Sequence, residues 1–90
     1  MRPVLFHTFV GRRFAVKTQK GLRLTFAECD EDKRELRIPV DGDMPYEMEW
    51  IVHEALHACY PWMGEDFVER GAKCIAGLLW RLGWRKGEKE

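Results

Sequence analysis

The stretch WIVHEALHAC, residues 50–59, carries the pattern from which the fold and the chemistry of this chain can be inferred. His53 and His57 stand four residues apart, and Glu54 directly follows the first of them. Residues four apart lie on the same face of an α-helix, so both imidazoles can reach one metal ion. Glu54 is then held close to that metal without being a ligand itself. The stretch predicts a helix that carries part of a zinc site.

The alternative interpretation is a helix with two solvated histidines and a surface glutamate. The other residues of the stretch are mostly apolar, so the helix must be largely buried. Buried imidazoles and a buried carboxylate need polar partners, which a bound metal supplies. We therefore favour the metal site.

Length and composition predict one domain, residues 1–90, with a net charge of zero. No apolar stretch reaches the roughly 18 to 20 residues that a membrane span requires, so we expect no membrane partner. Residues 1–7 lack the features of a signal peptide. The chain has three cysteines without C-x-x-C spacing, which indicates free thiols in a reducing cytoplasm.

The order of the patterns predicts an α+β fold, in which a small N-terminal antiparallel sheet of three to four strands is followed by two packed helices. Alternating and turn-forming residues place the strands between about 4 and 40. The individual strands are expected at 4–10, 13–18, 22–28 and 35–40, with 13–18 and 22–28 forming a hairpin. The helices are expected over about 44–59 and 65–82, with Gly83 as the C-cap of the second.

A catalytic zinc site needs a third protein ligand, and the second predicted helix offers Glu65, Asp66 and Glu69. Glu69 lies on the predicted inward face of that helix, and Glu65 lies one turn earlier on nearly the same side. Asp66 falls on the solvated side. We expect Glu69 to be the ligand and Glu65 to be the next candidate. The residues that predict the inward face are Val68, Ala72, Ile75, Ala76, Leu79 and Leu82.

Further polar side chains are candidates for supporting roles. Tyr46, Tyr60 and His7 could donate a hydrogen bond to a developing oxyanion, and the sequence does not rank them. Glu49, four residues before His53, could hold the second nitrogen of that histidine, or it could be a solvated carboxylate near the helix start.

The chain resembles the minimal gluzincins, compact zinc metallopeptidase-like domains of the small phage type. The resemblance rests on HEALHA, residues 53–58, and on ERGAKCIA, residues 69–76. The second segment is similar to the E-x-x-A-x-x-[FIL]-A helix of phage-repressor-cleaving metallopeptidases. The resemblance implies a zincin-like fold and a zinc-dependent hydrolase, which would act in the cytoplasm of the host cell if a phage encodes it. It also implies that a peptide or protein substrate binds near the last strand. It also implies His53, His57 and Glu69 as metal ligands and Glu54 as the general base.

Larger members of that family have an additional domain that forms the far wall of the cleft, so a protein partner that completes the cleft is a further expectation. The alternative function is a non-enzymatic binding or regulatory module that keeps the metal for stability. Structural zinc sites usually have four protein ligands, and the three found here favour an open, catalytic site. We do not expect nucleic acid as a partner, although a basic hairpin could follow a phosphate backbone. Its residues are Arg12, Arg13, Lys17, Lys20 and Arg23.

Overall fold

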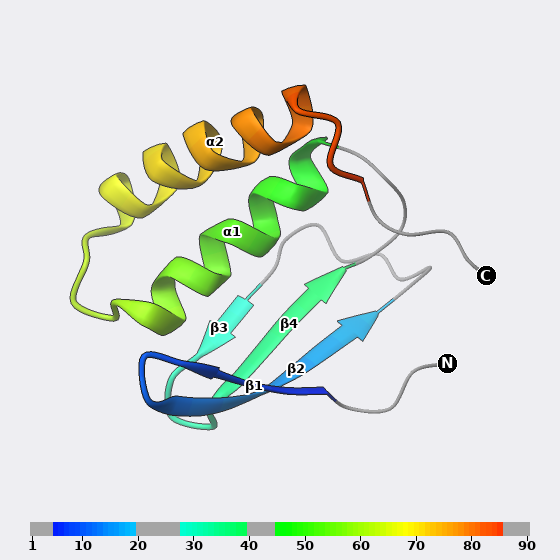
Figure 1. Cartoon of the computed structure of the whole chain (residues 1–90). Helices are drawn as coiled ribbons and strands as arrows, with labels where there is room; N and C mark the ends of the chain where they lie inside the picture. Colours follow the sequence, from blue (N-terminus) through cyan, green and yellow to red (C-terminus); the bar gives the residue numbers. More distant parts are fainter. Residues whose placement is uncertain (1–4, 20–27, 40–44, 86–90) are drawn as a thin grey trace.

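The computed structural model describes residues 5–19, 28–39 and 45–85. Four strands precede two helices: β1 (Leu5–Phe9), β2 (Arg12–Gln19), β3 (Glu28–Asp30), β4 (Glu35–Pro39), α1 (Pro45–Cys59) and α2 (Glu65–Arg81). The strands form one sheet, and α1 lies between this sheet and α2 (Figure 1). The predicted α+β fold, a sheet followed by two packed helices, is confirmed.

A two-residue turn joins β1 and β2 into an antiparallel hairpin. Its residues, Val10 and Gly11, both have a positive φ, 48° and 79°. Positive φ at both central residues is what a type I′ turn requires, and its twist matches that of the flanking strands. The strand predicted over 4–10 is therefore confirmed as β1, but it ends at Phe9 because Val10 belongs to the turn.

The sheet is mixed, so the prediction of a wholly antiparallel sheet is wrong. The strand order is β1-β2-β4-β3, and β2 pairs with β4 in parallel. The predicted hairpin partner of β2, residues 22–28, lies outside the described residues except for Glu28, which pairs with Arg37 of β4. A tight turn joins β3 to β4 into a second hairpin, and β4 is the strand of this hairpin that pairs with β2. Side-chain alternation shows that a strand has two faces but not which neighbour it pairs with or in which direction.

Both helices have nearly the predicted bounds. Helix α2 ends at Arg81 with Leu82 as its C-cap, one residue before the predicted C-cap Gly83, whose φ is 94°. The backbone N–H of Trp84 donates to the carbonyl oxygen of Leu79, and that of Gly83 donates to Trp80, both at 3.0 Å. These two bonds form a Schellman motif, in which glycine takes the left-handed conformation at no steric cost. Met44, the predicted first residue of the first helix, lies outside the described residues.

The main core lies between the sheet and α1. Phe14 of β2, Leu36 of β4 and Ala58 of α1 are almost completely buried and pack together. Burial of each of the two larger side chains contributes about 1.5–3 kcal/mol. The core therefore fixes α1 on the sheet through residues of the two central strands.

The two helices pack through small side chains. Val68, Ala72 and Ala76 of α2 are buried, and at Gly71 an added Cβ would lie 3.7 Å from Leu56 Cδ1 of α1. The predicted inward face of α2 is wrong at three other positions: Glu69 is exposed, and Ile75 and Leu82 are 43% and 65% exposed. The helix is apolar over a wider arc than α1 covers.

Arg12 connects the sheet to the C-terminal end of α1. Its guanidinium donates to the Glu31 carboxylate at 2.7 Å and to the carbonyl oxygen of Ala58. The last carbonyls of a helix lack helical partners, and a cation there is favoured by the helix dipole. The hydrogen bond to Glu31 raises the pKa of Arg12 above its ordinary value. The contact holds the β3–β4 turn against α1.

Candidate metal centre

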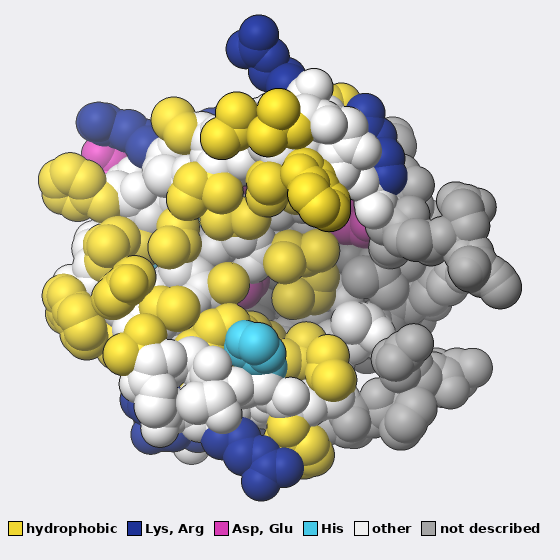
Figure 2. All heavy atoms as spheres, viewed as in Figure 1, with side chains coloured by type: hydrophobic (Ala, Val, Ile, Leu, Met, Phe, Trp, Pro, Cys, Tyr) yellow, Lys and Arg dark blue, Asp and Glu magenta, His cyan; other side chains and the backbone are white. Residues whose placement is uncertain are grey.

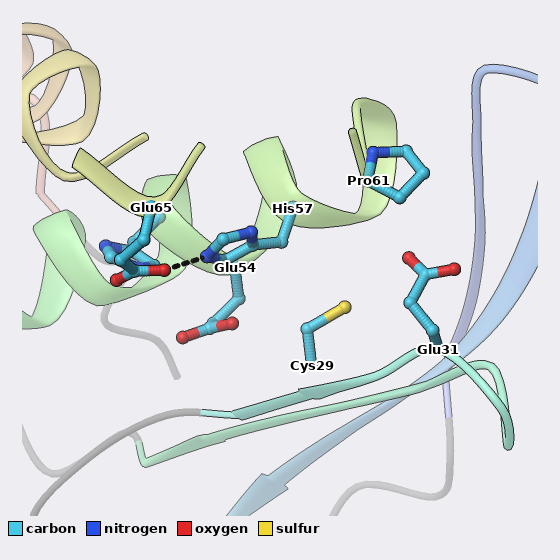
Figure 3. A pocket seen from close by; sticks show the side chains of 7 residues that line it. Cys29, Glu31, Glu54, His57, Pro61 and Glu65 are labelled. Atoms are coloured by element: carbon cyan, nitrogen blue, oxygen red, sulfur yellow. Dashed lines mark hydrogen bonds and ion pairs between the residues drawn. The ribbon is translucent and has the colours of Figure 1, made fainter. Parts of the chain in front are cut away.

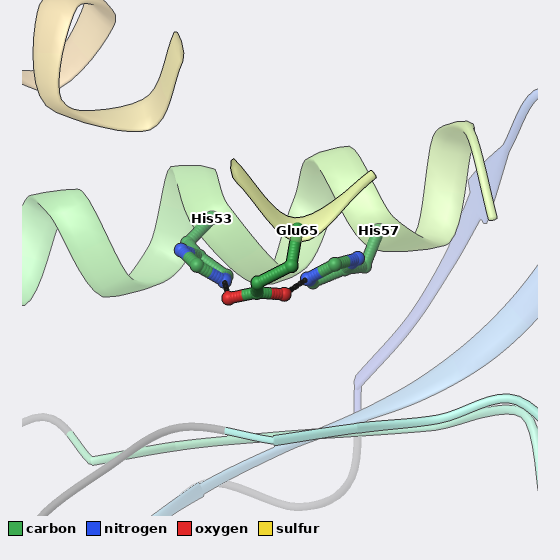
Figure 4. Close-up of side chains that lie close together, drawn as sticks. All are labelled: His53, His57 and Glu65. Atoms are coloured by element: carbon green, nitrogen blue, oxygen red, sulfur yellow. Dashed lines mark hydrogen bonds and ion pairs between the residues drawn. The ribbon is translucent and has the colours of Figure 1, made fainter. Parts of the chain in front are cut away.

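Helix α1 presents two histidines on one face. His53 and His57 are one turn apart, and their ring centroids are separated by 4.9 Å. Both side chains are largely buried, with 18% and 24% of their surface exposed. Their imidazoles lie on either side of the Glu65 carboxylate (Figure 4). The structure thus brings together the two histidines that the sequence pattern singled out.

Glu65, the first residue of α2, supplies an acidic group to the same point. Its Oε2 lies 3.0 Å from His53 Nε2, and its Oε1 lies 2.8 Å from His57 Nε2. One potential ligand atom from each of the three residues falls within 4.8 Å of the others. Among the described residues, this is the group of histidine, cysteine or acidic side chains with the spacing of a metal site.

Glu69, the expected third ligand, does not belong to this group, whereas the second candidate, Glu65, does. The reason is helical geometry. The buried residues Val68, Ala72 and Ala76 define the direction toward α1. At about 100° per residue, Glu65 lies about 20° from that direction and Glu69 about 60° from it. The short inter-helix loop also places the first turn of α2 beside the last turns of α1, so Glu65 meets the histidines and Glu69 is exposed.

The three side chains border a pocket of ≈ 310 Å³ between α1, the start of α2 and the region of β3 (Figure 3). Glu54 also lines this pocket and is buried, with 8% of its surface exposed. Its carboxylate extends from α1 toward the sheet, to one side of the histidine–glutamate group. The described residues that line it are Cys29, Glu31, His53, Glu54, His57, Pro61 and Glu65.

Cys29 and Glu31 are pocket residues that sequence reasoning did not identify. Burial, and to a smaller extent the nearby carboxylates of Glu31 and Glu54, together raise the pKa of the Cys29 thiol to about 11. The thiol is therefore neutral near pH 7. Neither residue lies at a recognisable distance from the H-E-x-x-H motif, because β3 approaches α1 only in the folded chain. A motif search had no signal with which to find them.

The donor set fits a zinc ion. Two imidazole nitrogens and one carboxylate are a common catalytic zinc set, with a fourth position left open. Tetrahedral coordination with bonds of about 2.0–2.1 Å places neighbouring ligand atoms about 3.3 Å apart. The two nitrogen–oxygen separations, 3.0 and 2.8 Å, run to different oxygens of Glu65, and the three ligand atoms lie within 4.8 Å of one another, so binding of the ion requires these side chains to move closer together. With 66% of its side chain exposed, Glu65 has room for that movement.

The other predicted supporting residues lie elsewhere. Neither Tyr46, Tyr60 nor His7 lines the described pocket. Tyr46 packs on Trp50, Tyr60 packs on Trp62, and His7 lines an apolar hollow beside Ile51 and Ala55. The carboxylate of Glu49 lies 4.0 Å from the ammonium of Lys73 on α2. The roles expected for these four residues therefore find no support in the described geometry.

The basic hairpin is partly neutralised by acidic neighbours. Arg12 pairs with Glu31, and Lys17 pairs with the buried Glu35. Arg13 stacks on the ring of Phe6 at 4.2 Å. Lys20 and Arg23 lie outside the described residues. The described part of the hairpin does not offer a row of free cations to a phosphate backbone.

Comparison with known proteins identifies no family for this chain. It matches no protein-family model, and no curated protein or solved structure shows significant similarity to it.

Proposed function

We propose that this chain is a zinc-dependent hydrolase of the metallopeptidase type, with His53, His57 and Glu65 as metal ligands. The observation that carries the proposal is the convergence of both Nε2 atoms on one carboxylate at 3.0 and 2.8 Å, beside a pocket that also contains Glu54. The zincin-like character suggested by the sequence resemblance is part of this proposal. The ligand assignment differs from the sequence expectation only in replacing Glu69 by Glu65.

Zinc in a site with three protein ligands supplies Lewis acidity, which polarises a carbonyl group and makes water a stronger acid. Glu54 follows His53 on α1 and extends into the same pocket, where its carboxylate is shielded from bulk solvent. From this position it would accept a proton from the attacking water and return it to the leaving amine. Glu54 is thus the general base, as its place in the motif suggests.

The pocket suits a substrate that reaches it from outside. It is bordered by Glu65, an exposed residue, and by the β3–β4 turn, which Arg12 holds in place. A peptide or protein substrate fits the reaction type, and a protein partner could supply a further wall. All three cysteines are free thiols, which supports a cytoplasmic location.

The alternative is a non-enzymatic module in which the same group has a structural role. The geometry that favours it is that Glu65 already contacts both imidazoles, a contact that ties α2 to α1. The two functions differ in what they require of Glu54. A structural cluster is indifferent to this residue, whereas hydrolysis depends on it.

Metal content is the first test. The purified full-length chain should contain or take up about one zinc ion, measured by elemental analysis and by titration calorimetry. Zinc at about 100 times its dissociation constant should increase the free energy of unfolding by about 2.7 kcal/mol. A folded chain that takes up no zinc would contradict both the hydrolase and a metal-stabilised module.

Glu54→Gln tests the enzymatic assignment. This variant should bind zinc like the original chain but hydrolyse a mixed peptide library about 10²–10⁴-fold more slowly, because the proton acceptor is lost. Glu49→Gln is the matched control, since it makes the same chemical change on the same helix away from the pocket. Equal peptide hydrolysis by the original chain and Glu54→Gln, with zinc bound to both, would rule out this mechanism.

A further inference from the structure

The outward side of α2 is apolar over much of its length. Phe67, Ile75, Leu78 and Leu82 are 69%, 43%, 58% and 65% exposed. At about 100° per residue they fall within an arc of about 80° on the helix surface. Trp84, just beyond the helix, is 62% exposed. We refer to these five residues as the α2 apolar arc.

Hydrophobic side chains are abundant on the face of the molecule that Figure 2 shows, where they lie over the helices and continue toward the sheet, with lysine and arginine side chains at the edges and few acidic ones. Single exposed apolar residues are ordinary on protein surfaces, but a contiguous row on one helix indicates a contact surface.

The charges beside the arc are positive. From position 70 to position 87 the sequence contains no acidic residue. Arg70 and Lys73 have 73% and 60% of their side chains exposed, and Arg81 and Arg85 are also exposed. Two of these cations have acidic neighbours: Asp66 pairs with Arg70 at 3.1 Å, and Glu49 of α1 lies 4.0 Å from Lys73. Glu69, just before Arg70, is a further exposed acid, and Arg81 and Arg85 supply the remaining positive charge. The arc is therefore bordered by a cationic flank.

This combination fits one partner best. A helix with aromatic and aliphatic side chains on one side and basic residues beside them is suited to lie in the interface of an anionic lipid bilayer. Its apolar side chains enter the boundary between headgroups and acyl chains, while arginine and lysine reach the phosphates. We propose that α2 docks this protein on an anionic lipid surface through the α2 apolar arc.

Pairing with a second copy of the chain is less favourable. An antiparallel two-fold pairing of α2 places the same flank of both helices side by side. Arg81 of one copy would lie close to Arg70 of the other, and the cations of the two flanks outnumber the acidic Asp66 residues, so like charges repel. An anionic bilayer instead attracts every cation on the flank.

Docking of this kind does not need a membrane span. No helix in the described ranges is long and apolar enough to cross a membrane. The expectation of no membrane partner rested on that criterion, which does not apply to a helix lying on the surface. At about 100° per residue, Glu65 lies about 120° around α2 from the centre of the arc, so the candidate metal centre would remain accessible when the arc is inserted.

Vesicle co-sedimentation of the full-length chain tests the proposal. Vesicles of phosphatidylcholine mixed with phosphatidylglycerol should bind it, and vesicles of phosphatidylcholine alone should bind it about tenfold more weakly or not at all. The double substitution Leu78→Ser and Leu82→Ser should weaken binding to the anionic vesicles by about tenfold or more, because apolar insertion is lost. The double substitution Lys73→Gln and Arg81→Gln should reduce it by about tenfold.

Val10→Ser is the matched control, because Val10 is 62% exposed but lies on the β1–β2 turn. It should bind anionic vesicles like the original chain. Circular dichroism and zinc uptake should be unchanged in the leucine variant, since both leucines are exposed. Absence of binding to the anionic vesicles, or equal binding by the leucine variant, would overturn the proposal. A dimer that the leucine substitutions dissociate, without vesicle binding by the original chain, would assign the arc to a second copy.

Discussion

The two openings beside α1 differ in chemistry although the same helix and the same sheet form both. On the β3 side lies the pocket of ≈ 310 Å³ with two histidines, three glutamates and a cysteine. On the β1 side lies a hollow of ≈ 200 Å³ in which His7 is the polar residue among apolar ones. Its lining is Leu5, His7, Phe9, Val16, Leu36, Ile38, Ile51 and Ala55.

The difference shows what a titratable residue needs in order to form a site. His7 has an aromatic neighbour, Phe9, at 4.6 Å between ring centroids, and the residues that line its hollow in the described part of the chain include no acidic side chain. His53 and His57 share a carboxylate and lie one turn apart on a rigid helix. Convergence of several donors, rather than the presence of a histidine, distinguishes a metal site from a packing residue.

Among the substitutions that test the difference between the two openings, we expect the largest effect on zinc binding from His53→Ala. Zinc affinity should fall by more than about a hundredfold, because loss of even a partner behind a ligand costs about ten- to a hundredfold. The zinc-dependent increase in melting temperature should disappear with it. Calorimetric titration and thermal melts with and without zinc measure both. Unchanged zinc binding would remove His53 from the ligand set.

The thiol in the polar pocket should be slow to alkylate. With a pKa raised from 9.0 to about 11, mainly by burial, Cys29 has about a hundredfold less thiolate near pH 8 than an ordinary thiol. Because its folded-state pKa is higher, the stability contributed by the neutral thiol is complete below about pH 9 and is lost as the pH rises through about 11. Mass spectrometry after iodoacetamide treatment should show Cys74, which is exposed, modified first. Equal rates in the folded chain would contradict the buried environment, and equal rates in urea are the control.

Variants of Glu65 and Glu69 test which of these two acidic residues of α2 is the third zinc ligand. Glu65→Gln should weaken zinc binding by at least about tenfold, since a charged ligand becomes a neutral one. Glu69→Gln, the same change one turn later at an exposed position, should leave zinc affinity unchanged. Parallel titrations of the two variants measure this. The opposite result would restore the assignment that the sequence favoured.

The smallest effect is expected on the apolar side of α1. His7→Ala should change zinc affinity by less than about twofold, because His7 does not line the pocket that holds the ligands. It should change the free energy of unfolding by no more than about 0.5 kcal/mol, because His7 is exposed. Calorimetry and urea unfolding provide the two values. A large loss of zinc binding would mean that the hollow and the polar pocket act as one site.

Helix positions were accessible from the sequence, and sheet partners were not. The period of the apolar residues and the glycine after α2 locate both helices to within a residue or two. The parallel pairing of β2 with β4 depends on contacts between distant segments, which alternation along one strand does not encode. The two-residue turn at Val10 and Gly11 was also missed, because valine is uncommon at a positive φ.

The H-E-x-x-H spacing by itself determined that His53 and His57 share a helix face with Glu54 beside them, because the geometry of a helix is local. Only the tertiary structure decided which acid completes the group and which strand residues line the pocket. The identity of the acid depends on the rotation of α2 about its own axis and on its position along that axis relative to α1. That arrangement is set by the short loop and by packing of Val68, Ala72 and Ala76, whose outcome is a property of the whole fold.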